Sequence, residues 1–354
     1  MKKFLSVMIV FVLLCNLSGC TNSNKSRLKK EETKTTEKKK EEVKKNQETT
    51  ADSLDTNNHQ SSEVSNTTNI QQDEQNVTNE VSVQYPVNHL SSGKTYTNRP
   101  SLPAISYHVK DANNQRGLSS TSYSFSFGVA KNGSPHQITI DNQKRFDSYQ
   151  TNALAWDNKT NNKVLYLTFD CGYEYKNLTG QILDVLKEKQ VSAGFFCTSS
   201  YINEAPQMVA RMINEGHIVG NHTVNHPSNC ALLSREAFAK EILGVHNTLR
   251  VRFGYDSRYF RFPTGTYSQN AIDLVNSVNY RSIFWSIAHA DWDPDNQPGI
   301  ETSFDTVTKR LHPGAVILLH STSPDNVAIL GRFIDYARNN GYTFQTLDQY
   351  AYWK

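Results

Sequence analysis

Five short segments of this 354-residue chain carry reactive side chains directly after apolar runs. In the first, the apolar run of residues 165–169 ends in Asp170 and Cys171, where a strand would give way to a loop. The other segments contain His222 with His226, Arg261, Asp291 with Trp292, and His320. Barrel enzymes collect their catalytic groups at the C-terminal ends of parallel strands. The ordered set therefore predicts one catalytic site built from several strand ends.

The two histidines are candidate metal ligands. His222 and His226 are spaced i,i+4, so on one helical turn both rings could hold a single cation. A bound cation lowers the pKa of its water and polarises a carbonyl group. Such a pair alone is often a coincidence, but its position after a predicted strand favours a metal site. We expect one divalent ion, with zinc favoured and manganese, magnesium or cobalt as alternatives.

The elements that must position these residues alternate along the chain from residue 164 onward. Strand-like runs at 164–169, 194–198, 218–220, 259–261, 282–285, 315–319 and 343–346 alternate with helical periodicity, which includes helices opened by Pro206 and capped by Ser234. Such alternation predicts a mostly parallel sheet with helices outside it. About seven repeats favour an α/β fold of the distorted (β/α)7 barrel type over an open sheet.

The start of the chain is predicted to be a lipoprotein signal peptide, residues 1–19. It has a basic start and an apolar stretch too short to span a bilayer. Residues 17–20, Leu-Ser-Gly-Cys, resemble a bacterial lipobox, which would make Cys20 the lipidated N-terminus. An ordinary cleavage site with an incidental cysteine is the alternative. Two or more acyl chains give stable anchoring, so we expect an extracytoplasmic protein on the outer face of the bacterial cell membrane.

Three regions are predicted to follow the signal peptide. Residues 20–94 are polar with almost no aromatic side chains, so we expect a disordered linker. Residues 95–163 form a lead-in segment that packs on the catalytic domain, which spans 164–354. The net charge of +3 neither favours nor excludes a polyanionic partner, and we expect a monomer that binds no nucleic acid. Three cysteines in the folded part do not make a disulfide framework.

From about residue 164 to 350 the chain resembles the polysaccharide deacetylases, carbohydrate esterase family 4 with its NodB-like domain. Residues 168–174 (Thr-Phe-Asp-Cys-Gly-Tyr-Glu), 284–286, 291–292 and 318–323 are closest to the delta-lactam-biosynthetic de-N-acetylases. That branch acts on N-acetylmuramic acid of peptidoglycan. The resemblance implies a hydrolase of linear amides that removes N-acetyl groups from cell-wall glycan. Deacetylation of N-acetylglucosamine or of another acetylated polysaccharide, and a catalytically weak wall-binding lipoprotein, are the alternatives.

The resemblance also implies roles for the acid and base groups. Asp170 corresponds to the general base, and Arg261 to the arginine that keeps this base ionised and oriented. His320 corresponds to the general acid for the leaving amine, with Asp291 fixing its tautomer and raising its pKa. A helix cap for Asp170 and a surface salt bridge for Arg261 are the structural alternatives.

Other motif positions shape the acetyl pocket. By resemblance, the backbone N–H of Thr264 completes an oxyanion site together with the metal. Trp292 and Leu318 wall the small pocket for the acetyl methyl group, although core packing explains both nearly as well. The remaining histidines of the folded part match no ligand position and are expected to be structural or superficial: His217, His246, His289 and His312.

Cys171 is where the chain departs from the family. Most members have an aspartate there as third metal ligand, and the muramic-acid branch typically has asparagine. A Cys171 thiolate could complete a Cys-His-His site, which would require a lowered pKa. Alternatively Cys171 is neutral and binds no metal, which is slightly favoured, or it forms a disulfide with Cys197 or Cys230.

Overall fold

The computed structural model describes residues 102–354. The predicted signal peptide, the lipidated Cys20 and the polar linker lie outside the described residues, as does the start of the lead-in, residues 95–101. Those assignments therefore stay predictions. Within residues 102–354, no helix is both long enough and apolar enough to cross a membrane.

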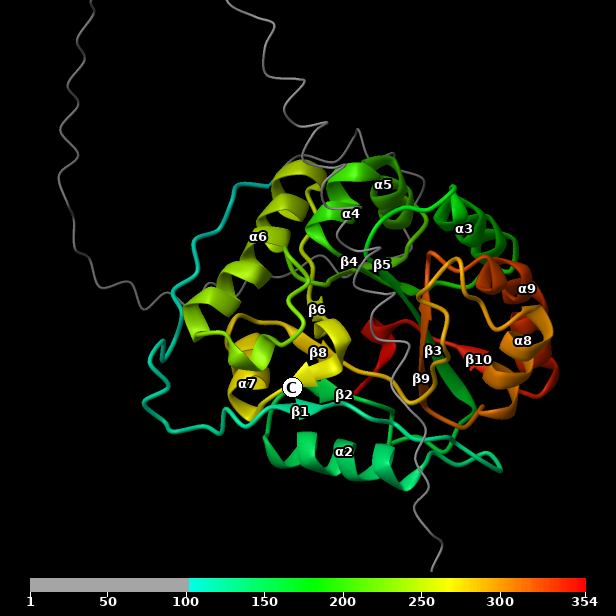
Figure 1. Cartoon of the computed structure of the whole chain (residues 1–354), viewed down its shortest axis with the longest axis horizontal. Coiled ribbons are helices and arrows are strands. Elements are labelled where there is room, and N and C mark those ends of the chain that lie inside the picture. Colours follow the sequence, from blue (N-terminus) through cyan, green and yellow to red (C-terminus); the bar gives the residue numbers. More distant parts are fainter. Residues whose placement is uncertain (1–101) are drawn as a thin grey trace, which may run out of the picture. The chain divides into compact units, whose positions relative to one another are not determined.

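The centre of the described part is a curled, parallel sheet (Figure 1). The strands run in the order β10 (Thr343–Phe344), β3 (Val164–Cys171), β4 (Gly194–Cys197), β5 (Ile218–Asn221), β6 (Tyr259–Phe260), β8 (Arg281–Ile283) and β2 (Ala153–Leu154), and β9 (Ala315–His320) also pairs with β3. After β8, Ile287 forms a parallel bridge with Ile317 of β9. The Leu318 N–H donates to the Ile287 carbonyl at 2.9 Å. These bonds bring the curled sheet back onto β9, and the predicted distorted α/β barrel is confirmed.

Helices cover the outside of the sheet. They are α3 (Leu178–Glu188), α4 (Ser199–Glu204), α5 (Pro206–Asn214), α6 (Arg235–Phe253), α7 (Gln269–Ser277), α8 (Ile300–Lys309) and α9 (Pro324–Asn339), with 3-10 turns η2 (Cys230–Leu232), η3 (Pro263–Gly265) and η4 (Leu347–Gln349). Ser234 caps α6 as predicted, because its side chain accepts the Ala237 N–H at 3.2 Å. Pro206 opens α5, where its missing N–H costs nothing.

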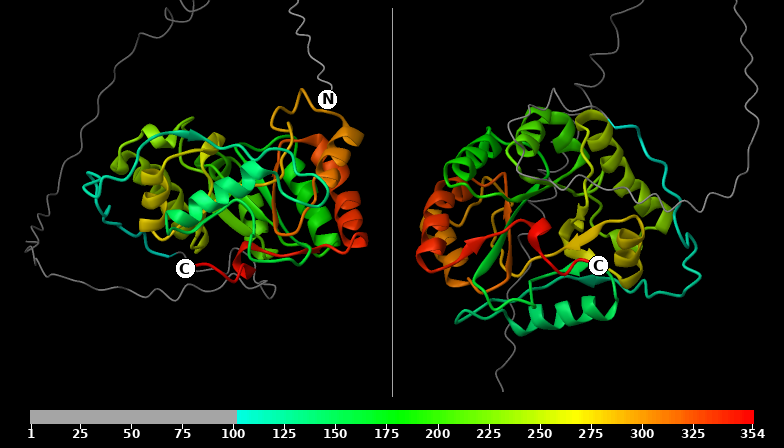
Figure 2. Two further views of the ribbon diagram at one scale, coloured as in Figure 1. Left: turned by 90° about the horizontal axis from the view of Figure 1, so that it is seen from below. Right: turned by 180° about the vertical axis from the view of Figure 1, so that it is seen from behind.

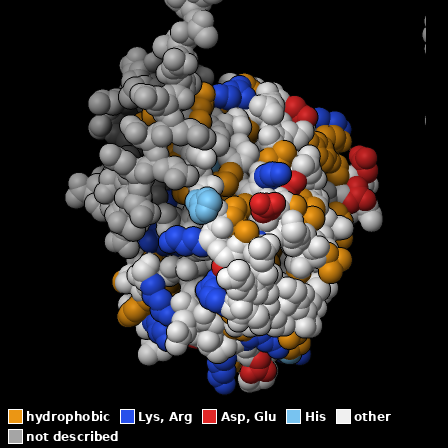
Figure 3. Space-filling model, turned by 90° about the vertical axis from the view of Figure 1, so that its left-hand side faces the viewer, with side chains coloured by type: hydrophobic (Ala, Val, Ile, Leu, Met, Phe, Trp, Pro, Cys, Tyr) orange, Lys and Arg blue, Asp and Glu red, His pale blue; other side chains and the backbone are white. Residues whose placement is uncertain are grey.

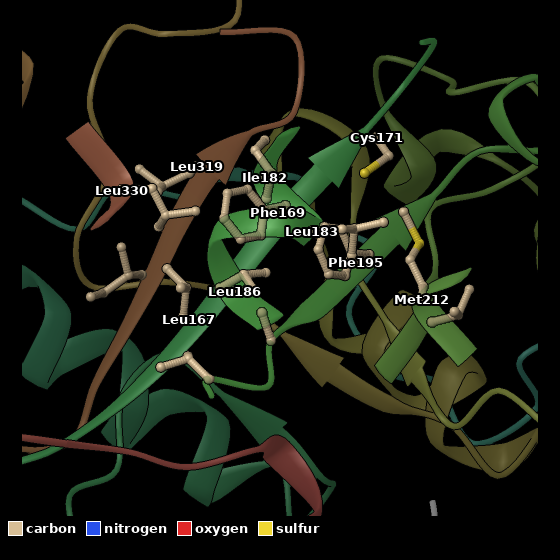
Figure 4. Close-up of a cluster of buried hydrophobic side chains, with 14 of the residues drawn as sticks. Leu167, Phe169, Cys171, Ile182, Leu183, Leu186, Phe195, Met212, Leu319 and Leu330 are labelled. Carbon is tan, nitrogen blue, oxygen red and sulfur yellow. The ribbon is translucent and has the colours of Figure 1, made fainter. Parts of the chain in front are cut away.

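Strand alternation divides the apolar side chains between two cores. Successive side chains of a strand point to opposite faces of the sheet. On β3, Leu165, Leu167, Phe169 and Cys171 belong to the core beneath the helices (Figure 4). Val164 and Tyr166 point the other way and join the second core, while Thr168 and Asp170 continue that face as polar residues. The position of a residue along β3 therefore decides whether it reaches the core or the site.

The lead-in is more ordered than the sequence indicated. It forms β1 (Tyr123–Ser124), helix α2 (Gln137–Ser148) and β2, and β1 pairs antiparallel with β7 (Thr266–Tyr267) (Figures 1 and 2). Helix α2 was not predicted, because its sequence has weak apolar periodicity; tertiary contacts of the buried Phe146 hold it instead. Strand β2 pairs with β8 of the main sheet. The lead-in and the barrel thus share one sheet.

Arginines fasten the first described residues to the barrel. Arg250 donates from Nε to the Pro103 carbonyl at 3.0 Å, and Arg235 donates to the Lys110 carbonyl at 3.1 Å. Arg116 forms an ion pair with Asp273 of α7. Figure 3 shows lysine and arginine side chains together with acidic ones on this side of the molecule. The surface here therefore has both charge signs.

Candidate active site

A cavity of about 1400 Å³ opens at the C-terminal ends of the barrel strands. Its lining includes seven of the residues predicted from the sequence: Asp170, His222, His226, Thr264, Trp292, Leu318 and His320. Arg261 and Asp291 lie directly behind this lining, bonded to Asp170 and His320. The structure thus brings all the predicted site residues together except Cys171.

Asp170 is held by Arg261. Nη1 of Arg261 donates to Asp170 Oδ1 at 2.8 Å, and both side chains are buried. The second oxygen, Oδ2, lies 3.5 Å from Nε2 of His222. Burial alone would raise the pKa of Asp170, but the charge of Arg261 and its hydrogen bond outweigh burial and lower this pKa. Asp170 is therefore an ionised carboxylate with one oxygen left at the cavity.

All three nitrogens of the Arg261 guanidinium donate hydrogen bonds within the protein. Nε donates to the Ile283 carbonyl at 3.1 Å, and Nη2 donates to Thr168 Oγ1 at 2.9 Å. The guanidinium plane also lies 4.1 Å from the ring centre of Phe196. Such a fixed fork is what distinguishes arginine from lysine. Arg261 therefore positions Asp170, and the alternative of a surface salt bridge is wrong.

The histidine pair does not lie on a helical turn, which corrects the sequence interpretation. Residues 222–226 form a loop after β5, and Thr223 and His226 have φ of 75° and 50°. Non-glycine residues are uncommon in this left-handed region, and such strain clusters at functional sites. The two ring centres nevertheless lie 4.9 Å apart. The loop, rather than i,i+4 spacing on a helix, brings His222 and His226 together.

The two imidazole rings of this loop are suited to bind one metal ion. Nδ1 of His222 donates to the Arg261 carbonyl at 2.9 Å, which leaves Nε2 with a free lone pair. Burial lowers the pKa of His222 to about 4, so the ring is neutral at neutral pH and its contact with Asp170 is no ion pair. Within the described part of the chain, no group of three His, Cys, Asp or Glu is arranged to hold a metal. His222 and His226 would thus hold the ion with solvent or substrate completing the shell.

His320 and Asp291 form the second charged pair. Nδ1 of His320 donates to Asp291 Oδ1 at 2.7 Å, and the His320 main-chain N–H donates to Oδ2 at 2.8 Å. Asn326 donates to the same Oδ2 at 2.6 Å. Burial lowers the pKa of His320, but the hydrogen bond and charge of Asp291 outweigh burial and raise it. The remaining nitrogen, Nε2, is free for the cavity, where the side chain is 25% exposed.

The two parallel strands place both pairs side by side. Asp170 of β3 and His320 of β9 are register partners, and the Ser321 N–H donates to the Asp170 carbonyl at 3.1 Å. Alternation also puts Leu318 on the same face as His320, buried and lining the cavity. The predicted base and acid therefore approach the cavity from adjacent strand ends.

The loop with Thr264 has an unusual backbone. Thr264 has φ 56° and ψ 0°, and its side chain donates to the Ser228 carbonyl at 2.9 Å. Pairing of β1 with β7 and a bond from the Phe125 N–H to the Gly265 carbonyl hold the loop from the lead-in side. The backbone is thus fixed in a strained turn at the cavity wall, and its role as an oxyanion donor stays a prediction.

Trp292 lies at the mouth of the cavity. It lines the cavity, but 62% of the residue is exposed. The predicted contribution of Trp292 to the wall of the acetyl pocket stays a prediction. Trp292 offers an aromatic face at the cavity mouth, while Leu318 provides the buried apolar wall.

Cys171 does not reach the site. It is the last residue of β3, and the strand continues one residue beyond Asp170, so the thiol points to the opposite face. It is fully buried in the helix-side core with Phe195 and Met212 (Figure 4). Its register partner on β4 is Cys197, and both thiols are free, as is Cys230. The thiolate-ligand and disulfide interpretations are wrong for this structure, and the neutral, non-ligating one agrees with it.

Sequence reasoning missed several residues that line the cavity. His289 is one of them: Nε2 donates to Asn326 Oδ1 at 3.0 Å, whereas Nδ1 is buried without a hydrogen-bond partner among the described residues. Residues 126–129 of the lead-in form another part of the wall. His217, His246 and His312 are buried, and burial lowers each of their pKa values to about 4, as expected of structural residues. The lead-in residues carried no motif that could have placed them here.

Comparisons with known proteins show which family the chain resembles. The sequence pattern of the polysaccharide deacetylase family matches residues 157–283. The peptidoglycan-N-acetylmuramic acid deacetylase PdaA of Bacillus subtilis is 36% identical over 196 residues, which are 55% of this chain and 74% of that protein. A peptidoglycan-N-acetylglucosamine deacetylase of Bacillus cereus is 32% identical over 203 residues, 55% of this chain and 70% of that protein.

A solved structure gives the same result. The structure of Bacillus subtilis PdaA, a family 4 carbohydrate esterase, superimposes with a TM-score of 0.61 at 33% identity and covers 65% of this chain and 97% of that one. The chain therefore belongs to the polysaccharide deacetylase family. It is a hydrolase of the class that cleaves amide bonds of acetylated glycans.

Proposed function

We propose that this protein removes N-acetyl groups from N-acetylmuramic acid in peptidoglycan, with a divalent metal ion, zinc favoured. The observation that carries the reaction is the cavity in which an ionised Asp170 faces His320 on the adjacent strand. The muramic acid preference is supported by the motifs of residues 168–174 and 318–323 and by the similarity to PdaA.

The residues divide the proton transfers between them. Asp170 Oδ2, the oxygen that Arg261 leaves free, accepts a proton from the attacking water. Nε2 of His320 gives a proton to the amide nitrogen, so that the leaving group departs as an amine. His222 and His226 would hold a divalent ion, which would supply activation of the water and polarisation of the acetyl carbonyl. The Thr264 N–H stabilises the developing oxyanion, and Leu318 packs on the acetyl methyl group.

The location of the enzyme belongs to the same proposal. A lipidated Cys20 followed by a polar segment would hold the enzyme on the outer membrane face and let its catalytic part reach wall strands. Metabolic labelling with palmitate should mark the wild-type chain and not Cys20→Ala, and that variant should leave the membrane fraction. Labelling that persists in Cys20→Ala would contradict the anchor.

The substrate is tested with purified residues 95–354 of the chain and with the full chain on isolated peptidoglycan. We expect acetate release that requires a divalent ion, and mass spectrometry should locate the missing acetyl group on muramic acid. Loss from glucosamine would instead support the N-acetylglucosamine alternative. Binding to walls without acetate release under any divalent ion, with Asp170→Asn indistinguishable from wild type, would show a wall-binding protein without activity.

A further inference from the structure

One cationic group in the cavity wall has no role in the proton transfers. Among the described residues that line the 1400 Å³ cavity, Arg310 is the only lysine or arginine, and Asp170 is the only carboxylate. Arg310 follows directly after α8 and is half-buried. Its Nη1 donates to the Ala288 carbonyl at 2.6 Å, which fixes one edge of the guanidinium. No further hydrogen bond of this guanidinium is present within residues 102–354.

The acidic groups nearest in sequence are engaged elsewhere. Asp305 pairs with Lys309, and Glu301 pairs with Arg332 through both oxygens, at 2.9 Å each. Burial lowers the pKa of Arg310, and no acidic group acts against this effect. A half-buried guanidinium without an acidic partner is suited to bind an anion, because its planar fork matches a carboxylate.

Arg310 also marks the point where the cavity continues. A second hollow of about 570 Å³ shares Val129, Thr306 and Arg310 with the first and extends along α8 past Lys131. Residues of the lead-in and of α8 therefore contribute to the walls of both hollows. A bound polymer could pass from the catalytic groups over Arg310 without leaving the groove.

We propose that Arg310 binds a lactyl carboxylate of the glycan strand and thereby selects muramic acid-containing polymers over neutral ones. The inference rests on the proposed function and names its specificity residue. Muramic acid differs from glucosamine by an O3 lactyl ether that carries a carboxylate, and a peptide-free strand displays one on every muramic unit. Arg261 cannot do this task, because it is fully buried, does not line the cavity, and donates from each nitrogen inside the protein.

The test uses the full chain with Arg310→Gln, Arg310→Lys and the control Arg252→Gln. Arg252 donates to Asn203 Oδ1 at 2.7 Å, and both residues lie outside the two hollows. Substrates are peptide-free glycan, the same glycan with its lactyl groups converted to methyl amides, peptide-bearing glycan, and chitooligosaccharide. For Arg310→Gln on peptide-free glycan we expect a KM about tenfold higher with kcat unchanged. On the amidated glycan and the chitooligosaccharide the variant should equal wild type. Arg310→Lys should recover most of the loss, and Arg252→Gln should change nothing.

Other outcomes overturn the proposal. An equal KM change on charged and amidated glycan would indicate a structural role, and a change on peptide-bearing glycan alone would assign the contact to a stem-peptide carboxylate. Equilibrium binding in the Asp170→Asn background keeps the test independent of turnover: Arg310→Gln should weaken binding of peptide-free glycan about tenfold and leave that of amidated glycan unchanged. Absence of acetate release by wild type would thus refute the proposed activity while binding still decides the role of Arg310.

Discussion

Two buried carboxylates at the same end of the barrel are built for opposite purposes. Asp170 and Asp291 are both paired with a cationic side chain, and in both the pKa is lowered although burial raises it. Asp170 gives one oxygen to Arg261 and keeps the other at the cavity. Asp291 gives Oδ1 to His320 and Oδ2 to the His320 main chain and Asn326, and it does not line the cavity.

The cationic partners of the two carboxylates, Arg261 and His320, also differ. Arg261 is permanently charged and immobilised, so it can only hold Asp170 ionised. His320 can gain or lose a proton, and Asp291 shifts this equilibrium towards the protonated form. Asp170 is an open carboxylate, with one oxygen free at the cavity, and is suited to accept a proton. Asp291 is a closed carboxylate, with both oxygens bonded inside the protein, and is suited to adjust the pKa of the proton donor His320. The surroundings, rather than the residue type, thus separate the base from the support of the acid.

The largest expected effect is on the rate of acetate release and follows from removing the open carboxylate, Asp170. Asp170→Asn keeps the shape of the side chain and abolishes its basicity, so acetate release should fall about 10³- to 10⁴-fold. The measurement is initial-rate acetate release, with circular dichroism to confirm folding. Asp291→Asn is the matched control, since it neutralises the other carboxylate. A larger loss in Asp291→Asn than in Asp170→Asn would reverse the assignment of the two carboxylates.

The next effect is on stability and concerns the fixed cation. Arg261→Met should destabilise the fold by about 3–5 kcal/mol at neutral pH, because Asp170 is left charged and buried without a partner. The free energy of unfolding in urea measures this loss. In the double variant Arg261→Met with Asp170→Asn no lone charge remains, so part of the stability should return. A double variant that is as unstable as the sum of both single changes would contradict coupling between the two residues.

The pH dependence of this stability has a definite sign. The pKa of Asp170 is lowered in the folded state, so its pairing contributes stability above the usual value of 3.8 and loses it as the pH falls through the folded value. Arg261→Met removes this contribution. Wild type and variant should therefore differ most at neutral pH and converge in acid, where Asp170 is protonated in both.

The sequence predicted much of this arrangement where local rules apply. Strand β3 with Asp170 near its end, the Ser234 cap and the start of α5 at Pro206 follow from periodicity and capping. The roles of Arg261 and His320 came from the family resemblance, and the structure supplies the contacts that local patterns do not contain. Asn326, for example, donates to Asp291, and no sequence spacing rule relates these two distant residues.

Three features that the sequence left undetermined or misassigned have a common physical origin. The helix expected at His222 and His226 fails because Thr223 and His226 take left-handed backbone angles, which only the surrounding loop determines. Helix α2 depends on contacts with the barrel rather than on its own weak periodicity. The face of Cys171 depends on β3 continuing through that residue, since a single step along a strand exchanges the faces. Each depends on tertiary structure.

A smaller effect, on the pH dependence of kcat, tests the closed carboxylate, Asp291. Asp291 raises the pKa of His320, so Asp291→Asn should lower this pKa and move the alkaline limb of kcat to lower pH. At pH values below the alkaline limb, kcat of Asp291→Asn should be only modestly lower than that of wild type. At a fixed alkaline pH above it, kcat should be about 100-fold lower. The pH profile of kcat measures the shift. His320→Gln should remove the limb altogether, and a limb unmoved in Asp291→Asn would exclude His320 as the group that titrates.

The smallest expected effect on catalysis compares the two faces of β3. Cys171→Ser should leave the metal content and kcat of the purified protein unchanged, because the thiol lies in the helix-side core and not in the cavity. Stability should still fall by about 1–3 kcal/mol, since a hydroxyl replaces the thiol among apolar side chains. Metal analysis and urea unfolding on the same samples separate the two quantities.

A positive control defines what ligand loss looks like. His222→Ala should abolish most metal binding, because it removes one of the two imidazoles that the loop brings together. Cys171, by contrast, is fully buried among apolar side chains and does not line the cavity. A fall in metal content in Cys171→Ser comparable to that in His222→Ala would require β3 to end at Asp170 in solution, with the thiol turned to the cavity.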